Sequence, residues 1–246
     1  MTLPEIVSRE QWLAARKELL LREKELTRQR DALNADRRRL PMVRVEQEYA
    51  FAGEEGTATL RELFGDSSQL IVQHVMFAPD WADPCPGCSA DLDESTPALL
   101  AHIRARDTAF VRVSRAPWAK LAATRAARSW TFPWYSSYGS DFNYDFHVTI
   151  DNAVAPPFFN YRDPLELADA GQGWLGQGSH EQPGYSCFLR DGDAVFHTYS
   201  TYARGTENAA PGAYALLDLT ALGRQEEWEE PKGRVASPGA ADPSFS

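Results

Sequence analysis

The sequence has few cysteines and no long apolar run. Only 3 of its 246 residues are cysteine, too few for a disulfide scaffold. No stretch approaches the roughly 20 apolar residues that a membrane-spanning helix needs. The amino terminus also lacks the cationic and then apolar order of a signal peptide. We therefore expect a cytoplasmic protein, where a cysteine pair serves redox or metal chemistry more often than structure.

The sequence also lacks an excess of positive charge. Its formal net charge is −10, which argues against nucleic acid or an anionic membrane as a partner. The distribution is uneven, because residues 1–40 carry 10 Lys/Arg and 7 Asp/Glu, a net charge of +3 against −13 in the remainder. A basic segment beside an acidic body predicts attraction within one chain or between subunits, and a solvated helix is the alternative.

A long stretch without glycine or proline, residues 8–39, is rich in strong helix formers and predicts a single helix. Ser8 and Gln11 form a capping-box pattern at its start, and Pro41 stops it. Leucines recur every seven residues, but the second position of each heptad that a coiled coil needs to be apolar is mostly charged or polar. One apolar residue per heptad makes too narrow a stripe for a robust coiled coil. We expect an interaction element that can support a homo-oligomer.

The predicted organisation has three parts. These are an N-terminal helical extension (1–41), one folded domain (42–230) and a disordered tail (231–246) that is rich in Pro, Gly, Ala and Ser.

A Cys-X-X-Cys pair, Cys85 and Cys88, directly follows the apolar run 70–77. Such a run is typical of a buried strand, so the pair falls where the strand gives way to a helix. The first thiol then lies near unsatisfied N–H groups that favour its thiolate. The pattern predicts redox exchange with a thiol or disulfide substrate and without a cofactor. One alternative is that the two cysteines form half of a zinc site, although no second CxxC or HxxxH motif follows. The other is a cysteine pair that catalyses no reaction, in a non-catalytic interaction module.

The order of elements beyond this pair predicts the fold. The expected strands are 70–77, 108–114, 185–189 and 194–199, and the expected helices are 89–105 (with a possible break at Pro97), 117–129 and 213–222. Parallel strands joined by a crossover helix and completed by an antiparallel hairpin are the order of the thioredoxin fold. Pro183 falls where thioredoxin-like proteins place a cis-proline opposite the dithiol.

Several long and irregular strings support a family resemblance. They are 22–28 (REKELTR), 37–43 (RRRLPMV), 77–81 (FAPDW), 85–89 (CPGCS), 113–117 (VSRAP), 136–146 (SSYGSDFNYDF) and 195–205 (VFHTYSTYARG). From about residue 8 to 226 the chain resembles the bacterial thioredoxin-like family catalogued as domain of unknown function 899. The resemblance implies an α/β fold, thioredoxin-like and peroxiredoxin-related, with a central mixed sheet flanked by helices and a long N-terminal helix. It implies no particular reaction.

Matching the thioredoxin pattern residue by residue makes Cys85 the attacking thiol, Cys88 the resolving thiol and Pro183 the cis-proline. The chain departs from that pattern in the Pro-Gly pair between the cysteines, which should alter the thiolate pKa and the redox potential. Pro84 replaces the tryptophan that usually precedes the first cysteine, although Trp81 could still cover the site and contact the substrate.

The peroxiredoxin motif is absent. The motif has a proline, then Thr or Ser four residues after it, and a cysteine seven residues after it. Counting from Pro79, those positions hold Asp83 and Pro86, so peroxide reduction is unsupported.

Two histidines are candidates for an auxiliary role. His74 lies on the strand that leads to the cysteines and could accept a proton there, and a hydrogen-bonded core histidine is the alternative reading. His197 invites the same two readings. Cys85, Cys88 and His197 together would offer thiolate and imidazole ligands for zinc, copper or haem iron, which is the main rival to redox exchange.

The segment 136–147 alternates polar and aromatic residues. Such alternation is typical of a strand with its polar side chains on one face. Asp141 and Asn143 on that face could line a substrate pocket near the thiols, and a structural loop is the alternative.

Overall fold

The computed structural model describes residues 3–203, 205–206, 212–222, 227–228, 230–233 and 236. The chain divides into two compact units, of which one is 42–212 and the other comprises the terminal segments 1–41 and 213–246. The predicted domain boundaries and the predicted assembly through the N-terminal segment stay predictions. Most of the predicted tail lies outside the described residues.

The terminal unit contains two helices, α1 (Arg9–Arg37) and α7 (Ala213–Leu217). The capping box of α1 is present, because Ser8 Oγ accepts a hydrogen bond from the Gln11 N–H and Gln11 Oε1 accepts one from the Ser8 N–H. The predicted long helix is thereby confirmed, and none of its residues is buried. Helix α7 is shorter than predicted. No described helix combines the length and apolar character that crossing a bilayer requires.

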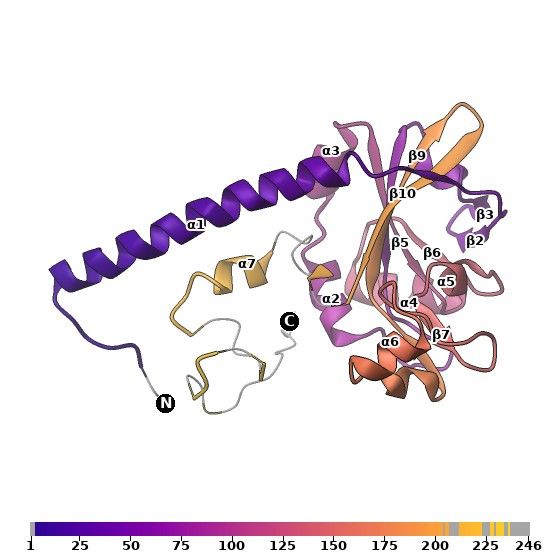
Figure 1. Ribbon diagram of the computed structural model, residues 1–246. Helices are drawn as coiled ribbons and strands as arrows, with labels where there is room; N and C mark the ends of the chain where they lie inside the picture. Colours follow the sequence, from indigo (N-terminus) through magenta and orange to yellow (C-terminus); the bar gives the residue numbers. More distant parts are fainter. Residues whose placement is uncertain are drawn as a thin grey trace. The chain divides into compact units, whose positions relative to one another are not determined.

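The domain 42–212 is built on an eight-stranded mixed sheet (Figure 1). Its strands are β1 (Val43–Arg44), β2 (Ala50–Gly53), β3 (Gly56–Thr59), β4 (Gln69–His74), β5 (Thr108–Ser114), β6 (Trp134–Ser136), β9 (Gly184–Asp191) and β10 (Ala194–Tyr202). Their order across the sheet is β1-β10-β9-β4-β5-β6-β2-β3.

The centre of this sheet has the thioredoxin-like topology. Strands β4 and β5 are parallel and joined by a helical crossover, while β9 lies antiparallel to β4 and continues into β10 through a hairpin. Strand β6 adds a second parallel pairing beside β5, and the β2–β3 hairpin extends the sheet beyond it. The fold expected from the order of elements is therefore confirmed.

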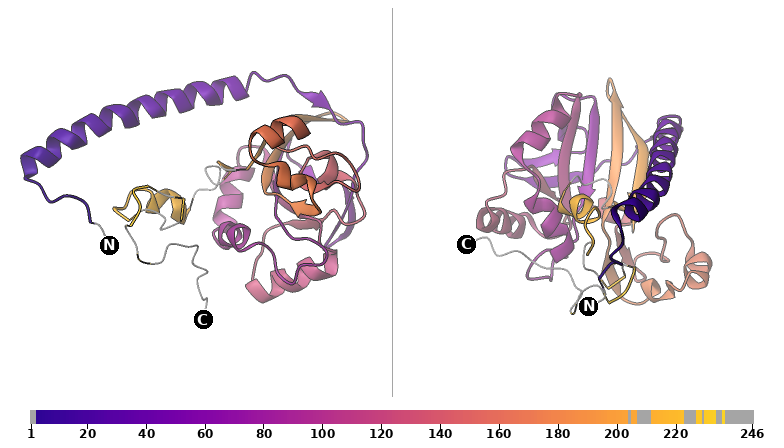
Figure 2. Two further views of the ribbon diagram at one scale, coloured as in Figure 1. Left: turned by 60° about the horizontal axis from the view of Figure 1, so that its bottom comes forward. Right: turned by 90° about the vertical axis from the view of Figure 1, so that its left-hand side faces the viewer.

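Helices cover both faces of the sheet (Figure 2). The helical elements of the domain are α2 (Pro86–Asp93), α3 (Pro97–Arg104), α4 (Trp118–Arg128), α5 (Phe142–Asp145), α6 (Pro164–Asp169) and the 3-10 turns η1 (Glu62–Phe64) and η2 (Gly173–Gly176). Leu92, Leu100 and Leu121 of α2, α3 and α4 pack on one face, and Phe142 of α5 packs on the other. Pro97 separates α2 from α3, at the predicted break, because a proline at the first helical position needs no hydrogen bond there.

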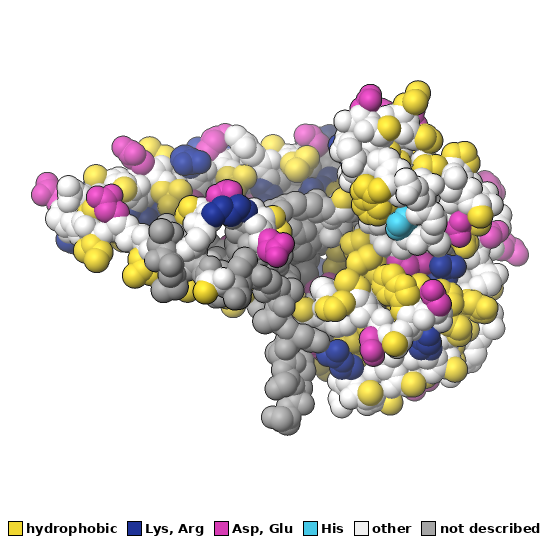
Figure 3. Space-filling view, turned by 90° about the horizontal axis from the view of Figure 1, so that it is seen from below, with side chains coloured by type: hydrophobic (Ala, Val, Ile, Leu, Met, Phe, Trp, Pro, Cys, Tyr) yellow, Lys and Arg dark blue, Asp and Glu magenta, His cyan; other side chains and the backbone are white. Residues whose placement is uncertain are grey.

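Besides the two cores that lie on the two faces of the sheet, the domain has a third, smaller core. Most of it comes from the segment between α5 and β9. It is formed by α6, η2 and a separate two-stranded sheet of β7 (Thr149–Asp151) and β8 (Ser179–Glu181). Hydrophobic side chains gather in the middle of the domain face seen from below (Figure 3). Residues 147–183 thus form an insertion that ends directly before β9.

The prediction of a strand-like segment around residues 141–147 is wrong. Phe142–Asp145 form α5, and the rings of Phe142 and Phe146 lie 4.6 Å apart within one core cluster. Residues four apart share one face of a helix, so these two aromatic residues bury together. The polar residues between them therefore do not share one face.

Candidate functional site

The Cys-X-X-Cys pair lies where β4 leads into α2. Cys85 is the N-cap residue of α2, and Pro86 occupies the first helical position, where its missing N–H costs nothing. The Cys85 N–H donates a 3.0 Å hydrogen bond to the carbonyl of Met76, which fixes this cysteine at the carboxyl end of β4. The preceding loop is held by Lys120, whose Nζ donates to the carbonyls of Pro79 and Trp81.

The cysteines of the pair differ sharply in acidity. All three cysteines of the chain are free thiols; Cys85 is half-buried and Cys88 is buried. A hydrogen bond from the Cys88 thiol, with further ones from the backbone N–H groups of Cys88 and Gly87, lowers the pKa of Cys85 to about 6. The same hydrogen bond and burial raise the pKa of Cys88. At neutral pH the pair is therefore one thiolate and one thiol.

The two cysteines belong to a hydrophobic cluster. Met76, Trp81 and Trp118 are partly buried and pack in the same cluster as Cys85 and Cys88. Trp81 thus belongs to the same cluster as the dithiol, and its role in covering the site stays a prediction. The third cysteine, Cys187, is partly buried on β9, and burial raises its pKa to about 11.

Pro183 directly precedes β9 at the same end of the sheet. His74, the last residue of β4, is paired with Gly184 in an antiparallel register, so Pro183, which precedes Gly184, is next to the segment that leads to Cys85. The Gln182–Pro183 peptide bond is trans rather than cis. The sequence left the isomer of this bond open, and the cis isomer that thioredoxin-like proteins have at this position is not present.

His74 is on the face of the sheet opposite α2. Its ring stacks near Phe142 and Phe146, and its Nε2 makes a 2.8 Å hydrogen bond with Ser186 Oγ. The adjacent residue Gln73 instead contacts Asp91 of α2, as expected because successive residues of a strand point to opposite faces. The structure therefore does not bring His74 to the thiols, and its contacts are those of a core histidine.

Burial of His74 has a consequence for stability. Desolvation, with a smaller contribution from His197, lowers the pKa of His74 to about 3. The unfolded chain binds a proton at this histidine below about pH 6.5 while the folded chain does not, so the free energy of unfolding falls with acidity between about pH 6.5 and 3, by up to about 1.4 kcal/mol per pH unit. Urea unfolding at pH 7 and pH 5 should show a smaller loss for His74→Gln than for the wild type. The exposed His102→Gln serves as the control, and an unchanged pH dependence in His74→Gln would contradict the assignment.

His197 belongs to the same polar chain as His74. Its Nε2 makes a 2.7 Å hydrogen bond with Ser200 Oγ, which bonds in turn with Ser186 Oγ. Among the described residues, no group of three or more His, Cys, Asp or Glu side chains is placed to hold a metal ion. The alternative ligand set of Cys85, Cys88 and His197 is thus not brought together.

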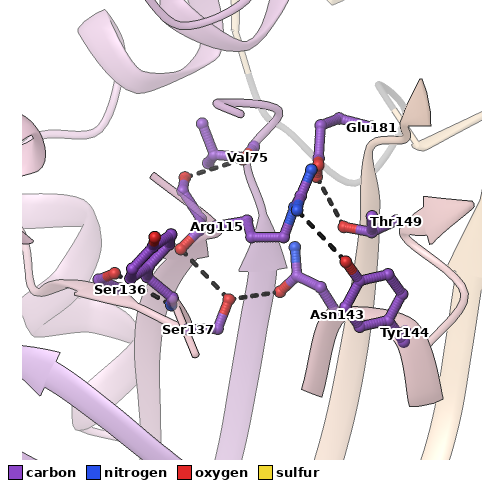
Figure 4. Close-up of polar contacts among 10 residues, drawn as sticks. Val75, Arg115, Ser136, Ser137, Asn143, Tyr144, Thr149 and Glu181 are labelled. Carbon is purple, nitrogen blue, oxygen red and sulfur yellow. Dashed lines mark hydrogen bonds and ion pairs between the residues drawn. The ribbon is translucent and has the colours of Figure 1, made fainter. Parts of the chain in front are cut away.

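The predicted substrate-binding residues Asp141 and Asn143 differ in environment. Asp141 is exposed, whereas Asn143 is buried and accepts a 2.7 Å hydrogen bond from Ser137 Oγ. Asn143 lies in a polar network around Arg115, whose side chain reaches both Glu181 and Tyr144 (Figure 4). This network ties β5 and α5 to the insertion.

The pair formed by Arg115 and Glu181 is largely buried. Arg115 Nε donates to Glu181 Oε1 at 2.7 Å, and Thr149 Oγ1 donates to the other carboxylate oxygen at 2.9 Å. Burial raises the pKa of Glu181, while Arg115 acts in the opposite direction. Neither residue was singled out from the sequence, because isolated charged residues give no spacing signal.

A second polar network beneath α2 was also missed. It consists of Gln73, Asp91, Arg112 and Tyr185, which we call the Asp91 network. Asp91 Oδ2 accepts hydrogen bonds from Gln73 Nε2 and from Tyr185 Oη, and Arg112 Nε donates to Gln73 Oε1. The one available signal was the spacing of Cys88 and Asp91, since residues three apart are neighbours on a helix.

Comparison with solved structures gives distant neighbours. A peroxiredoxin Q mutant of Xanthomonas campestris is 15% identical, with 65% of this chain and 84% of that chain covered and a TM-score of 0.42. A PrxQ mutant of Xylella fastidiosa is 14% identical (66% and 82% covered, TM-score 0.44). BsSco, of the Sco family of cytochrome c oxidase assembly proteins, is 15% identical (69% and 88% covered, TM-score 0.37).

No curated protein matches the chain. The family model described as "Bacterial protein of unknown function (DUF899)" matches residues 1–237. Because this match covers nearly the whole sequence, the chain belongs to this family.

Proposed function

We propose that the protein carries out thiol–disulfide exchange through Cys85 and Cys88. The observation that carries the proposal is the pairing of a half-buried thiolate with a buried thiol that hydrogen-bonds to it at the start of a helix. A pKa near 6 leaves most of Cys85 ionised at neutral pH while retaining a nucleophilic sulfur.

The exchange proceeds in two balanced steps. The Cys85 thiolate attacks one sulfur of a substrate disulfide, forming a mixed disulfide and releasing the first substrate thiolate. Cys88 then loses its proton and attacks the Cys85 sulfur, forming the Cys85–Cys88 disulfide and releasing the second substrate thiolate. The substrate gains two electrons, and the protein dithiol loses two.

Substrate contacts are assigned to the residues that border Cys85. Trp81 lies in its apolar cluster, and Pro183 is at the adjoining end of β9. The apolar surroundings favour a disulfide flanked by uncharged groups. Asp141 and Asn143 are not included, because α5 packs on the face of the sheet opposite α2, and Asn143 is also held by Ser137.

The proposal is tested by reduction of insulin disulfides with dithiothreitol as the electron donor. The wild type should accelerate the reduction, and thiol titration before and after oxidation should show a loss of two thiols per chain. Metal content is measured on the same samples. Absence of acceleration together with a stoichiometrically bound metal would replace redox exchange by the metal-binding alternative.

A further inference from the structure

The Asp91 network lies on the same side of α2 as the buried thiol. Cys88 and Asp91 are three positions apart in α2, so their side chains are neighbours. The negative charge of Asp91 contributes to raising the pKa of Cys88, and the ionised Cys88 thiol would in turn contribute to raising that of Tyr185. Both network residues are therefore close to this thiol.

The hydrogen bonds of the Asp91 carboxylate are unevenly divided. Gln73 and Tyr185 both donate to Oδ2. Within the part of the chain that the structure describes, Oδ1 accepts no hydrogen bond. One carboxylate oxygen is thus fixed, and the other is available to a proton donor.

A fully buried cation, Arg112, lies near the Asp91 carboxylate. The Arg112 side chain has no exposed surface, and its guanidinium lies 3.9 Å from the Phe110 ring centroid and 4.5 Å from that of Phe132. It hydrogen-bonds to Gln73 and Ser95, while its Nη1 is buried without a partner among the described residues. A buried charge is costly unless an opposite charge lies near, and Asp91 supplies that charge.

We propose that Asp91 accepts the proton of Cys88 when the mixed disulfide is resolved, with Gln73, Tyr185 and Arg112 as positioning residues. This inference rests on the proposed thiol–disulfide exchange and assigns its second step. The proton passes from Cys88 Sγ to Asp91 Oδ1, and the Cys88 thiolate attacks the Cys85 sulfur. The bond between Cys85 and the substrate sulfur breaks, and the substrate thiolate leaves with the electron pair.

The two steps can be separated with an aromatic disulfide whose released thiolate absorbs visible light. One equivalent is released when Cys85 attacks and a second when Cys88 resolves the adduct; Cys187→Ser is used as the background. In Asp91→Asn the first release should change by no more than about twofold, and the second should slow by roughly a hundredfold at pH 7. The second rate should then rise about tenfold per pH unit, since Cys88 must ionise unaided.

Asp93→Asn is the matched control. Asp93 is on the same helix but accepts its hydrogen bond from Trp130, so neither release should change. Tyr185→Phe should slow the second release several-fold, and Asp91→Glu should restore part of it. If Asp91→Asn does not fold, these two variants decide the question.

A second release that is unaffected in Asp91→Asn and Tyr185→Phe, or equally slowed in Asp93→Asn, would overturn the assignment. A wild type that releases no thiolate at all would instead contradict the exchange reaction itself.

Discussion

Replacing Cys85 with serine is expected to abolish disulfide reduction. A serine hydroxyl stays protonated near neutral pH, so the nucleophile is lost and the rate should fall by roughly three orders of magnitude or more. Because Cys85 is only half-buried at the cap of α2, the domain should remain folded. The insulin assay measures the rate, and circular dichroism confirms the fold.

Two further substitutions make this prediction specific. Cys88→Ser should complete only the first step and accumulate a mixed disulfide that mass spectrometry detects as one substrate adduct per chain. With alanine in place of serine at this position, the pKa of Cys85 should also rise above 6, because the largest stabilising hydrogen bond comes from the Cys88 thiol and alanine has no donor. Cys187→Ser should retain wild-type activity. Activity that persists in Cys85→Ser would remove this residue from the mechanism.

Replacing Arg115 with methionine is expected to destabilise the domain strongly. The substitution leaves the Glu181 carboxylate buried without its cation, and breaking a buried pair in this way costs about 3–5 kcal/mol. It also removes the hydrogen bond from Arg115, which directly follows β5, to Tyr144 of α5. Urea unfolding followed by tryptophan fluorescence measures the loss.

An exposed ion pair in the same domain provides the control. Arg61 and Asp193 pair at the surface, so Arg61→Met should cost no more than about 1 kcal/mol. The double substitution Arg115→Met with Glu181→Leu should recover part of the stability, since no buried charge then remains. Equal losses in the Arg115 and Arg61 variants would show that the buried pair does not stabilise the domain.

The elements that follow from local chemistry were predictable from the sequence. Ser8 and Gln11 marked the start of α1, and the apolar run 108–114 coincides with β5. Cys85 and Cys88 were found because their spacing carries the chemistry itself. In each case, the residues that carry the signal lie within a few positions of the helix, strand or reactive group that they indicate.

Two parts of the site depend on contacts that sequence spacing does not encode. Alternating aromatic residues place Phe142 and Phe146 four apart, which fits a strand and a helical turn equally well, and packing against Tyr49 and Phe51 decides for the turn. The sequence also does not show on which face of the sheet His74 lies, because a central strand is apolar on both sides. Only the position of α2 distinguishes Gln73 from His74 as the neighbour of the dithiol.

The unequal acidities of the three thiols make the native chain suitable for selective chemical labelling. A soft electrophile applied briefly at neutral pH meets one ionised sulfur, at Cys85, and two protonated ones. A fluorophore or affinity handle can thus be attached at the reactive position without engineering a cysteine-free background. The extent of labelling then reports how much of the protein in a sample is reduced.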